Sequence, residues 1–399
     1  MTARALEGIS VLDLSEYVAG AYCGKLLGEF GAEVIKVENP EGDRARREGP
    51  FLNKVPHQET SALFAYLNTN KLGITVDCRK KSGQKILREL VSRADILVEN
   101  FGPQLRERLG LSLEIMHEWN SRLITVSISY FGETGPYARF RGTPLVAYAL
   151  GGYMYLTGEP DREPLQGPGP QPEYLGGLHG AIGALASLCS REHTGVGQHV
   201  EVPIFEAMVS LHQFTIVRYN YGGIIQKRLG NRYAWTHPIT LYACQDGYVA
   251  MSASAEDQAQ RLMYMIGMES LLEDPRFADG LHRLANADAF DALVEPWFRE
   301  RSKEEVFHLC QEWRIPCGLV TTAEDLLHDP QYLAREYWVQ VEHPATGVVT
   351  FPGAPFRMSE TPWLAGRAPL LGEHNQMILG ERLGYSMPDL VRLRQDGVI

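Results

Sequence analysis

The sequence predicts a protein of the α/β class, with a large parallel-sheet domain and a smaller α+β domain. Over the first 130 residues, short apolar runs typical of strands alternate with segments of helical periodicity. The middle of the chain changes to paired short strands followed by acidic helices. The chain has 399 residues, 44% of them hydrophobic, which is enough to form two domains with sizeable cores.

The first part of the chain can be followed element by element. We expect strands at residues 9–14, 33–38, 74–77, 96–98, 123–127 and 198–202, and helices at residues 19–30, 80–94 and 204–221. Strands separated by helices form βαβ units, so the sheet is predicted to be parallel. A Gly- and Pro-rich connection at residues 158–172 leads into a helix to about residue 189. Small residues recur along that helix at about every third position, which lets it pack closely against a neighbour.

The domain boundaries follow from changes in pattern along the chain. Residues 1–221 are expected to form the first part of the large domain. Residues 222–302 are expected to form the small domain, because two short strands bracket the turn Gln245-Asp246-Gly247 before the acidic helices begin. Residues 303–399 return to the large domain and end in an extended tail marked by prolines.

The charge of the chain is distributed unevenly. The formal net charge is −11, which argues against a general nucleic-acid-binding protein. However, residues 44–141 contain 16 Lys and Arg against 10 Asp and Glu, whereas residues 251–350 contain 8 against 18. We therefore expect any anionic partner to bind the first of these stretches.

Several common classes of site and location are not supported by the sequence. There is no long apolar run for a membrane span and no apolar leader, and six sparse cysteines without metal-finger spacing favour a reducing cytoplasm. The glycine-rich dinucleotide and phosphate-binding fingerprints are missing, as are the serine-hydrolase and zinc-protease motifs. The twelve histidines are scattered, so no metal site is expected.

A series of short motifs runs through nearly the whole chain in a fixed order. They are LDLSEYVAG at residues 12–20, GAEVIKVE at 31–38, ADILVENF at 94–101, GPY at 135–137, TGVGQ at 194–198, GNR at 230–232, IPCG at 315–318 and APLLGEH at 368–374. Each motif alone is weak, but together they resemble the class III CoA-transferases of the CaiB/BaiF type. This family includes formyl-CoA and carnitine CoA-transferases as well as α-methylacyl-CoA racemases.

The resemblance implies both a fold and an activity. It implies a Rossmann-like large domain built from both chain ends, a smaller domain, and two subunits interlocked as a dimer. It also implies exchange of CoA between an acyl-CoA, such as succinyl-CoA, and a carboxylic acid through an enzyme-bound anhydride and thioester. CoA is then a substrate and no cofactor is bound covalently. The partner subunit is either a second copy or a related chain, as in the heteromeric benzylsuccinate-type CoA-transferases, and neither nucleic acid nor membrane is expected.

The same resemblance indicates residues for the CoA site. CoA carries phosphates and an adenine ring, so its site needs cations, N–H donors and a flat apolar slot. The basic stretch offers Lys54, Lys71, Arg106 and Arg108, and Lys36 precedes it. The residues predicted to bind CoA are Tyr17, Val18, Ala19, Lys71, Asn100, Phe101 and Arg108. Two alternatives stay open, because Phe101 could be a core aromatic and Arg108 a solvated helix charge.

The catalytic carboxylate implied by the resemblance falls on Glu173. The family uses an aspartate before an aromatic residue and a Gly-rich helix, whereas this chain has Glu173 before Tyr174 and no aspartate between Asp161 and Asp246. Three interpretations stay open. Glu173 is the nucleophile, or it marks a silent subunit that pairs with an aspartate-bearing homologue, or it merely caps the helix.

A racemase is disfavoured by the residues after the GPY motif. Racemases of the family use a His-Asp pair after a glycine there for proton exchange at the α-carbon. This chain has Gly142-Thr143-Pro144 instead, so the imidazole that two-base exchange requires is missing.

Overall fold

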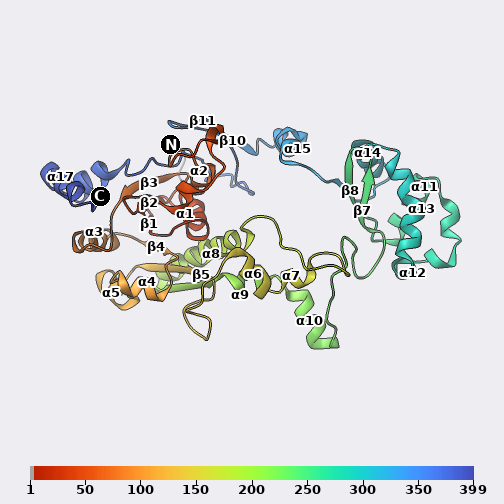
Figure 1. Ribbon diagram of the computed structural model, residues 1–399, viewed down its shortest axis with the longest axis horizontal. Coiled ribbons are helices and arrows are strands. Elements are labelled where there is room, and N and C mark those ends of the chain that lie inside the picture. Colours follow the sequence, from red (N-terminus) through yellow and green to blue (C-terminus); the bar gives the residue numbers. More distant parts are fainter. Residues whose placement is uncertain (1–3) are drawn as a thin grey trace. The chain divides into compact units, whose positions relative to one another are not determined.

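The computed structural model describes residues 4–399, apart from the side chain of Gln213. The chain divides into two compact units (Figure 1). The first unit contains the residues up to Tyr153, Gly167–Ile216 and Ala334–Ile399, and the second contains Met154–Gln166 and Val217–Leu333. The short helices α7 (Tyr153–Leu156), α10 (Gln213–Gly222) and α16 (Pro330–Ala334) span three of the points where the chain passes between units.

The first unit is organised around a six-stranded parallel sheet, as predicted. The strands are β1 (Ser10–Asp13), β2 (Glu33–Glu38), β3 (Lys71–Thr75), β4 (Ile96–Glu99), β5 (Ile124–Ser129) and β6 (His199–Pro203). Their order is β3-β2-β1-β4-β5-β6, so the direction of winding reverses between β1 and β4. Leu12, for example, pairs with Ile35 on one side and Leu97 on the other. Open parallel sheets bind ligands beyond the carboxyl ends of the strands at such a point.

Helices cover both faces of this sheet, which explains why its strands are apolar runs. One face packs Leu12 and Leu97 against α3 (Lys81–Val91) and α5 (Leu113–Trp119). The other packs Val11 and Val98 against α1 (Ala19–Glu29) and α8 (Gln171–Thr194). Other α-helices of the first unit are α2 (Ala62–Leu67), α4 (Pro103–Arg108), α6 (Pro144–Leu150), α9 (Ile204–Ser210) and α17 (Met387–Gln395).

The glycine-rich helix α8 packs as closely as its sequence predicts. A Cβ atom at Gly177 would lie 2.4 Å from the Ala19 carbonyl oxygen of α1, and one at Gly180 would lie 2.8 Å from Ile128 of β5. Neither distance is compatible with a larger side chain. The glycines therefore bring the start of α8 against the start of α1, at the carboxyl end of the sheet.

Two predicted elements have different bounds in the structure. The strand predicted at residues 74–77 runs from Lys71 to Thr75, because the buried charge of Lys71 hides its first residue from an apolar pattern. The helix predicted at residues 204–221 is divided into α9 and α10 at Leu211 and His212.

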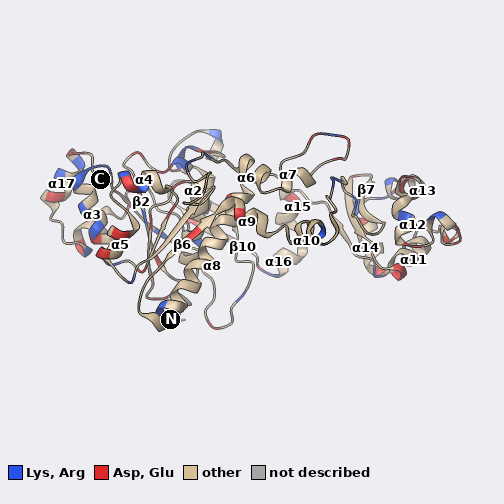
Figure 2. Cartoon of the chain, turned by 90° about the horizontal axis from the view of Figure 1, so that it is seen from below, with Lys and Arg blue, Asp and Glu red and all other residues tan. Residues whose placement is uncertain are grey.

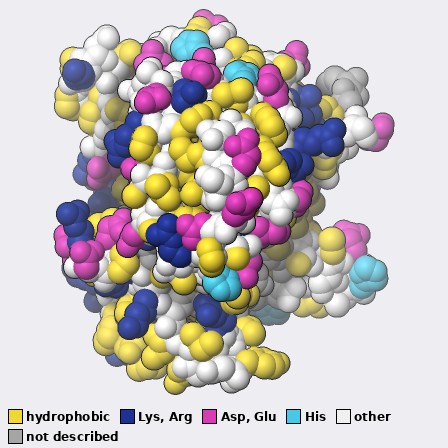
Figure 3. All heavy atoms as spheres, turned by 90° about the vertical axis from the view of Figure 1, so that its right-hand side faces the viewer, with side chains coloured by type: hydrophobic (Ala, Val, Ile, Leu, Met, Phe, Trp, Pro, Cys, Tyr) yellow, Lys and Arg dark blue, Asp and Glu magenta, His cyan; other side chains and the backbone are white. Residues whose placement is uncertain are grey.

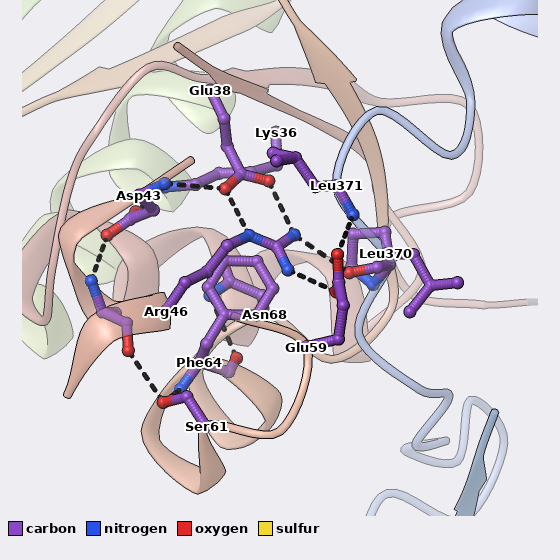
Figure 4. A network of polar contacts seen from close by, with 12 residues as sticks. Lys36, Glu38, Asp43, Arg46, Glu59, Ser61, Phe64, Asn68, Leu370 and Leu371 are labelled. Atoms are coloured by element: carbon purple, nitrogen blue, oxygen red, sulfur yellow. Dashed lines mark hydrogen bonds and ion pairs between the residues drawn. The ribbon is translucent and has the colours of Figure 1, made fainter. Parts of the chain in front are cut away.

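The C-terminal segment from Ala334 to Ile399 belongs to the first unit. The Arg46 guanidinium donates to Glu38 at 2.6 and 2.9 Å, to Glu59 at 2.7 Å and to the Pro369 carbonyl at 3.1 Å (Figure 4). The Leu371 amide donates to Glu59 at 3.1 Å. A buried arginine thus joins the early and late parts of the chain. The antiparallel hairpin β10 (Trp338–His343) and β11 (Gly347–Pro352) belongs to the same unit.

The second unit is an antiparallel sheet with helices. Its strands are β7 (Ile239–Cys244), β8 (Gly247–Ser252) and β9 (Cys317–Leu319), and its α-helices include α11 (Glu256–Met265), α12 (Gly280–Ala285), α13 (Ala287–Arg299), α14 (Lys303–Glu312) and α15 (Ala323–His328).

The bounds predicted for the small domain differ from those of the second unit. The predicted boundary at residue 302 is too early, because β9 pairs with β8 and α14 packs on both. Residues 154–166, predicted in the large domain, also belong here. Figure 3 shows the face of the molecule that lies on the right-hand side of Figure 1, and on this face acidic and basic side chains are interspersed with hydrophobic ones.

Candidate active site

A cavity of about 380 Å³ lies in the first unit, beyond the carboxyl ends of β1, β4 and β5. Its walls come from the start of α1, the loop after β4, the end of β5, the loop at residues 138–142 and the starts of α8 and α9. Four residues predicted from the sequence line it, namely Ala19, Asn100, Phe101 and Glu173. The cavity thus occupies the place where the sheet topology favours a ligand.

Glu173 occupies the first turn of α8 and is 5% exposed. The Tyr130 hydroxyl donates a hydrogen bond to its Oε1 atom. Its Oε2 atom is also buried but has no hydrogen-bond partner in the structure. Burial raises the pKa of Glu173, although the Tyr130 hydrogen bond and the charge of Arg44 act in the opposite direction. The result is a desolvated carboxylate on a residue that lines the cavity, with one oxygen hydrogen-bonded and the other without a partner among the residues described.

The local sequence explains why the carboxylate is placed there. Pro172 suits the first turn of a helix, where its missing N–H is not needed. A carboxylate in the same turn is favoured by the helix dipole. The glycine contacts of α8 with α1 then hold this turn beside Ala19.

The segment from Tyr17 to Ala19 connects β1 to α1 and is held tightly. Tyr17 has a positive φ of 68°, and its backbone N–H donates to Asp43 at 3.1 Å. The Arg44 guanidinium lies over the Tyr17 ring at 4.7 Å. Val18 is fully buried in the core, so a ligand could meet it only through the backbone. Ala19 lines the cavity.

Asn100 and Phe101 follow β4 and shape the cavity in different ways. Asn100 accepts from the Glu16 N–H at 2.9 Å and donates to the Glu16 carbonyl at 2.6 Å, which joins the loops after β1 and β4. Phe101 lines both this cavity and a second one of about 180 Å³. The second cavity has apolar walls that include Val37, Val76 and Leu109. Phe101 is therefore both a partly buried core contact and a wall shared by two cavities.

The two arginines of α4 have different environments. Arg106 is buried, donates to Glu99 and Ser127 at 3.0 Å each, and pairs with Glu133. Its charge is therefore used within the fold. Arg108 is exposed and forms no ion pair within the part of the chain that the structure describes. It remains available to an anion, next to Leu109 of the second cavity.

Lys71 does not fit the role predicted for it. The side chain is 3% exposed, and its ammonium group donates to Asp13 at 2.7 Å, to the Ala21 carbonyl at 2.8 Å and to Asn68 at 3.0 Å. An ammonium group has three donors, and all three are used. The Lys71 ammonium group therefore has no donor left for CoA. Lys36 is likewise buried, in an ion pair with Asp43 at 2.8 Å.

The structure adds residues that the sequence reasoning missed. They are Tyr130, Arg139 and Arg141, which line the larger cavity. The signal for Arg139 and Arg141 was available, since both follow the GPY motif within four residues. Tyr130 had no such signal, because its contact with Glu173 joins residues 43 positions apart.

Between residues 4 and 399, no group of three or more His, Cys, Asp and Glu side chains is placed to hold a metal ion. None of the helices described has both the length and the apolar character needed to cross a bilayer.

Comparison with known proteins identifies related chains. The family model described as "CoA-transferase family III" matches residues 6–375. A succinyl-CoA–D-citramalate CoA-transferase of Chloroflexus aurantiacus is 34% identical, over 99% of this chain and 98% of the relative. A subunit of the succinyl-CoA:(R)-benzylsuccinate CoA-transferase of Thauera aromatica is 33% identical, over 95% of each chain.

The solved structures agree with the sequence comparison. The crystal structure of a CaiB/BaiF family protein from Brucella suis has a TM-score of 0.88 and 32% identity to this chain. The match covers 96% of this chain and all of that one. The likeness therefore extends over both units described above.

Proposed function

This chain belongs to CoA-transferase family III, and from that premise we propose that it transfers CoA from an acyl-CoA to a carboxylic acid with Glu173 as nucleophile. Succinyl-CoA is the proposed donor, because the names of relatives such as the D-citramalate enzyme specify it. One observation carries the proposal: Glu173 lines a cavity, and its buried Oε2 atom has no hydrogen-bond partner among the residues that the structure describes.

The first half of the proposed reaction moves CoA onto the protein. Oε2 of Glu173 attacks the thioester carbonyl carbon, the C–S bond breaks, and the CoA thiolate leaves a mixed anhydride on Glu173. The thiolate then attacks the Glu173 carbonyl carbon and expels the donor acid as a carboxylate. The product is a glutamyl-CoA thioester, so one difficult exchange is divided into several easier steps.

The second half reverses these steps with the acceptor. The acceptor carboxylate attacks the Glu173 carbonyl carbon, and the CoA thiolate leaves to give a new anhydride. The thiolate next attacks the acceptor's carbonyl carbon and releases the free carboxylate of Glu173. No proton needs to be transferred in any of the four steps, which agrees with a site built around a carboxylate and a hydroxyl donor.

CoA is proposed to lie along the carboxyl edge of the sheet. The segment from Tyr17 to Ala19 contacts its pantetheine chain, while Asn100, Phe101 and Arg108 contact its nucleotide end. The apolar walls of the smaller cavity suit an adenine ring, and exposed Arg108 suits a phosphate. CoA enters as a substrate, and no cofactor is proposed.

A silent subunit is the second candidate, because one relative at 33% identity is named as a subunit of a larger enzyme. In that case Glu173 would accept no acyl group, and a related chain would supply the nucleophile. Purified chain should be incubated with succinyl-CoA, treated with hydroxylamine or borohydride, and analysed by peptide mass spectrometry. Modification of Glu173 supports the first function, whereas CoA binding without modification supports the second.

A paired subunit is proposed in either case. Helix α8 is nearly free of charge along its length (Figure 2), and Leu178, Ile182 and Leu185 on it are 42%, 55% and 40% exposed. Such a stripe favours burial against another surface. We propose an interlocked dimer, formed by two copies or with a related chain, and native mass spectrometry distinguishes these assemblies. All six cysteines are free thiols, which fits a cytoplasmic protein.

A further inference from the structure

We propose that Tyr130 is a positioning residue for Glu173, because its hydroxyl holds Oε1 and leaves Oε2 as the attacking atom. This inference rests on the proposed function, since it requires Glu173 to be the nucleophile. Tyr130 comes directly after β5, whereas Glu173 lies on α8. The contact therefore joins two elements of the scaffold, and both residues line the cavity.

The hydroxyl is suited to act as a permanent donor. Burial and the neighbouring Glu173 carboxylate both raise the pKa of Tyr130 above its usual value, so the phenol keeps its proton. A glutamate side chain has three rotatable bonds, and a hydrogen bond to one oxygen restricts the last of them. The orientation matters, because a displacement of about 1 Å can reduce a rate by roughly a hundredfold.

Tyr130 is itself held both at its ring and at its backbone. A Cβ atom at Gly142 would lie 2.1 Å from Cγ of Tyr130, so the backbone of the loop at residues 138–142 lies directly against the ring. The Phe205 N–H at the start of α9 donates to the Tyr130 carbonyl at 3.1 Å. The tyrosine therefore has little freedom to move away from the carboxylate.

The test is Tyr130→Phe, which removes the hydroxyl and keeps the ring. We expect kcat to fall about 10- to 100-fold while KM for acyl-CoA changes less than threefold. The acid limb of the kcat–pH profile should move to higher pH, because the lost hydrogen bond favoured the ionised carboxylate. A merely structural role would lower stability without moving this limb.

Two further variants make the test specific. Tyr385→Phe removes another tyrosine–glutamate contact, that of Tyr385 with Glu89 at 3.3 Å, which lies outside the residues lining the cavity. It should leave kcat and the pH profile unchanged. Gly142→Ala keeps the hydroxyl but displaces the ring, so it should lower kcat as Tyr130→Phe does, and its pH profile decides the question if Tyr130→Phe does not fold.

The outcomes separate this inference from the function on which it rests. If the wild-type protein forms no Glu173 adduct with succinyl-CoA, the proposed function is overturned. If the wild-type adduct forms and Tyr130→Phe forms it at the same rate with the same pH profile, the positioning role is overturned. If the adduct forms tenfold or more slowly in Tyr130→Phe, with the shifted acid limb, the positioning role is supported.

Discussion

Asp13 and Glu173 are two buried carboxylates in the same unit with opposite surroundings. Asp13 ends β1, where its Oδ2 accepts from Lys71 at 2.7 Å and its Oδ1 accepts from the Ser15 N–H at 3.0 Å. Although burial alone would raise the pKa of Asp13, the charges of Lys36 and Lys71 hold it below its usual value. Every oxygen of Asp13 is thus occupied.

Glu173 has one hydroxyl partner and one free oxygen, and burial raises its pKa. Burial alone therefore does not indicate what a carboxylate does. A carboxylate whose oxygens are all paired holds the fold together, because its removal leaves other buried charges unpaired. A carboxylate with a free oxygen beside a cavity is available for chemistry at a cost in stability.

Glu173→Gln should have the largest effect on the reaction. The amide keeps the shape and can still accept the Tyr130 hydrogen bond, but it is not a nucleophile. We expect the transfer rate to fall at least about 1000-fold, with thermal stability unchanged or slightly higher because a desolvated charge is removed. Initial rates and thermal unfolding measure the two effects. A rate within tenfold of the wild type would support the silent-subunit function instead.

Asp13→Asn should have the largest effect on stability. The substitution removes the carboxylate that pairs with both Lys36 and Lys71, and it leaves Lys71 buried without an ion-pair partner among the residues described. Breaking a buried pair in this way costs about 3–5 kcal/mol, and a lower denaturation midpoint should report it. Asp161→Asn, on an exposed residue, is the matched control and should change the midpoint little. A loss below about 1 kcal/mol for Asp13→Asn would mean that the pairing contributes little.

The two carboxylates should also respond to acid in opposite ways. The pKa of Glu173 is raised in the folded protein, so its protonation stabilises the fold while it removes the nucleophile. Activity should therefore decline at a pH above the usual glutamate range. The pKa of Asp13 is lowered in the folded protein, so its ionised form stabilises the fold at pH values above the pKa that Asp13 has in the unfolded chain. This stabilisation is lost only as the pH falls through the lower pKa of the folded state. Rates and unfolding measured between pH 4 and 7 should show activity declining before stability.

The sequence predicted the sheet well because strand burial on both faces produces a local apolar signal. It also predicted Ala19, Asn100, Phe101 and Glu173 as site residues, and the structure brings them to one cavity. Tyr130 was not predicted as a site residue, because its role depends on a contact with Glu173, which is distant in the sequence. Lys71 was misassigned because a buried lysine and a solvated one are identical in sequence, and only the partners of the ammonium group distinguish them.

The sequence also predicted the second unit only in part, because some of its strand pairs join distant residues. The hairpin of β7 and β8 could be predicted from the turn at residues 245–247, because hairpin turns are local. Strand β9 could not be assigned to that sheet, since Ala250 pairs with Gly318 across 68 residues. The second unit therefore ends at Leu333, whereas the sequence pattern predicted its end at residue 302.

Arg108 should show the smallest effect, and that effect should be on binding. Unlike Arg106 on the same helix, it has no carboxylate partner among the residues described, so it can pair with a phosphate of CoA. Arg108→Ala should raise KM for acyl-CoA about tenfold and leave kcat unchanged, because the contact is the same in ground and transition states. Arg394→Ala, on an equally exposed helix position of the same unit, is the control. The difference between the two variants should shrink as salt is raised, since exposed charges are screened. An unchanged KM at low salt would mean that Arg108 is simply solvated and makes no contact with CoA.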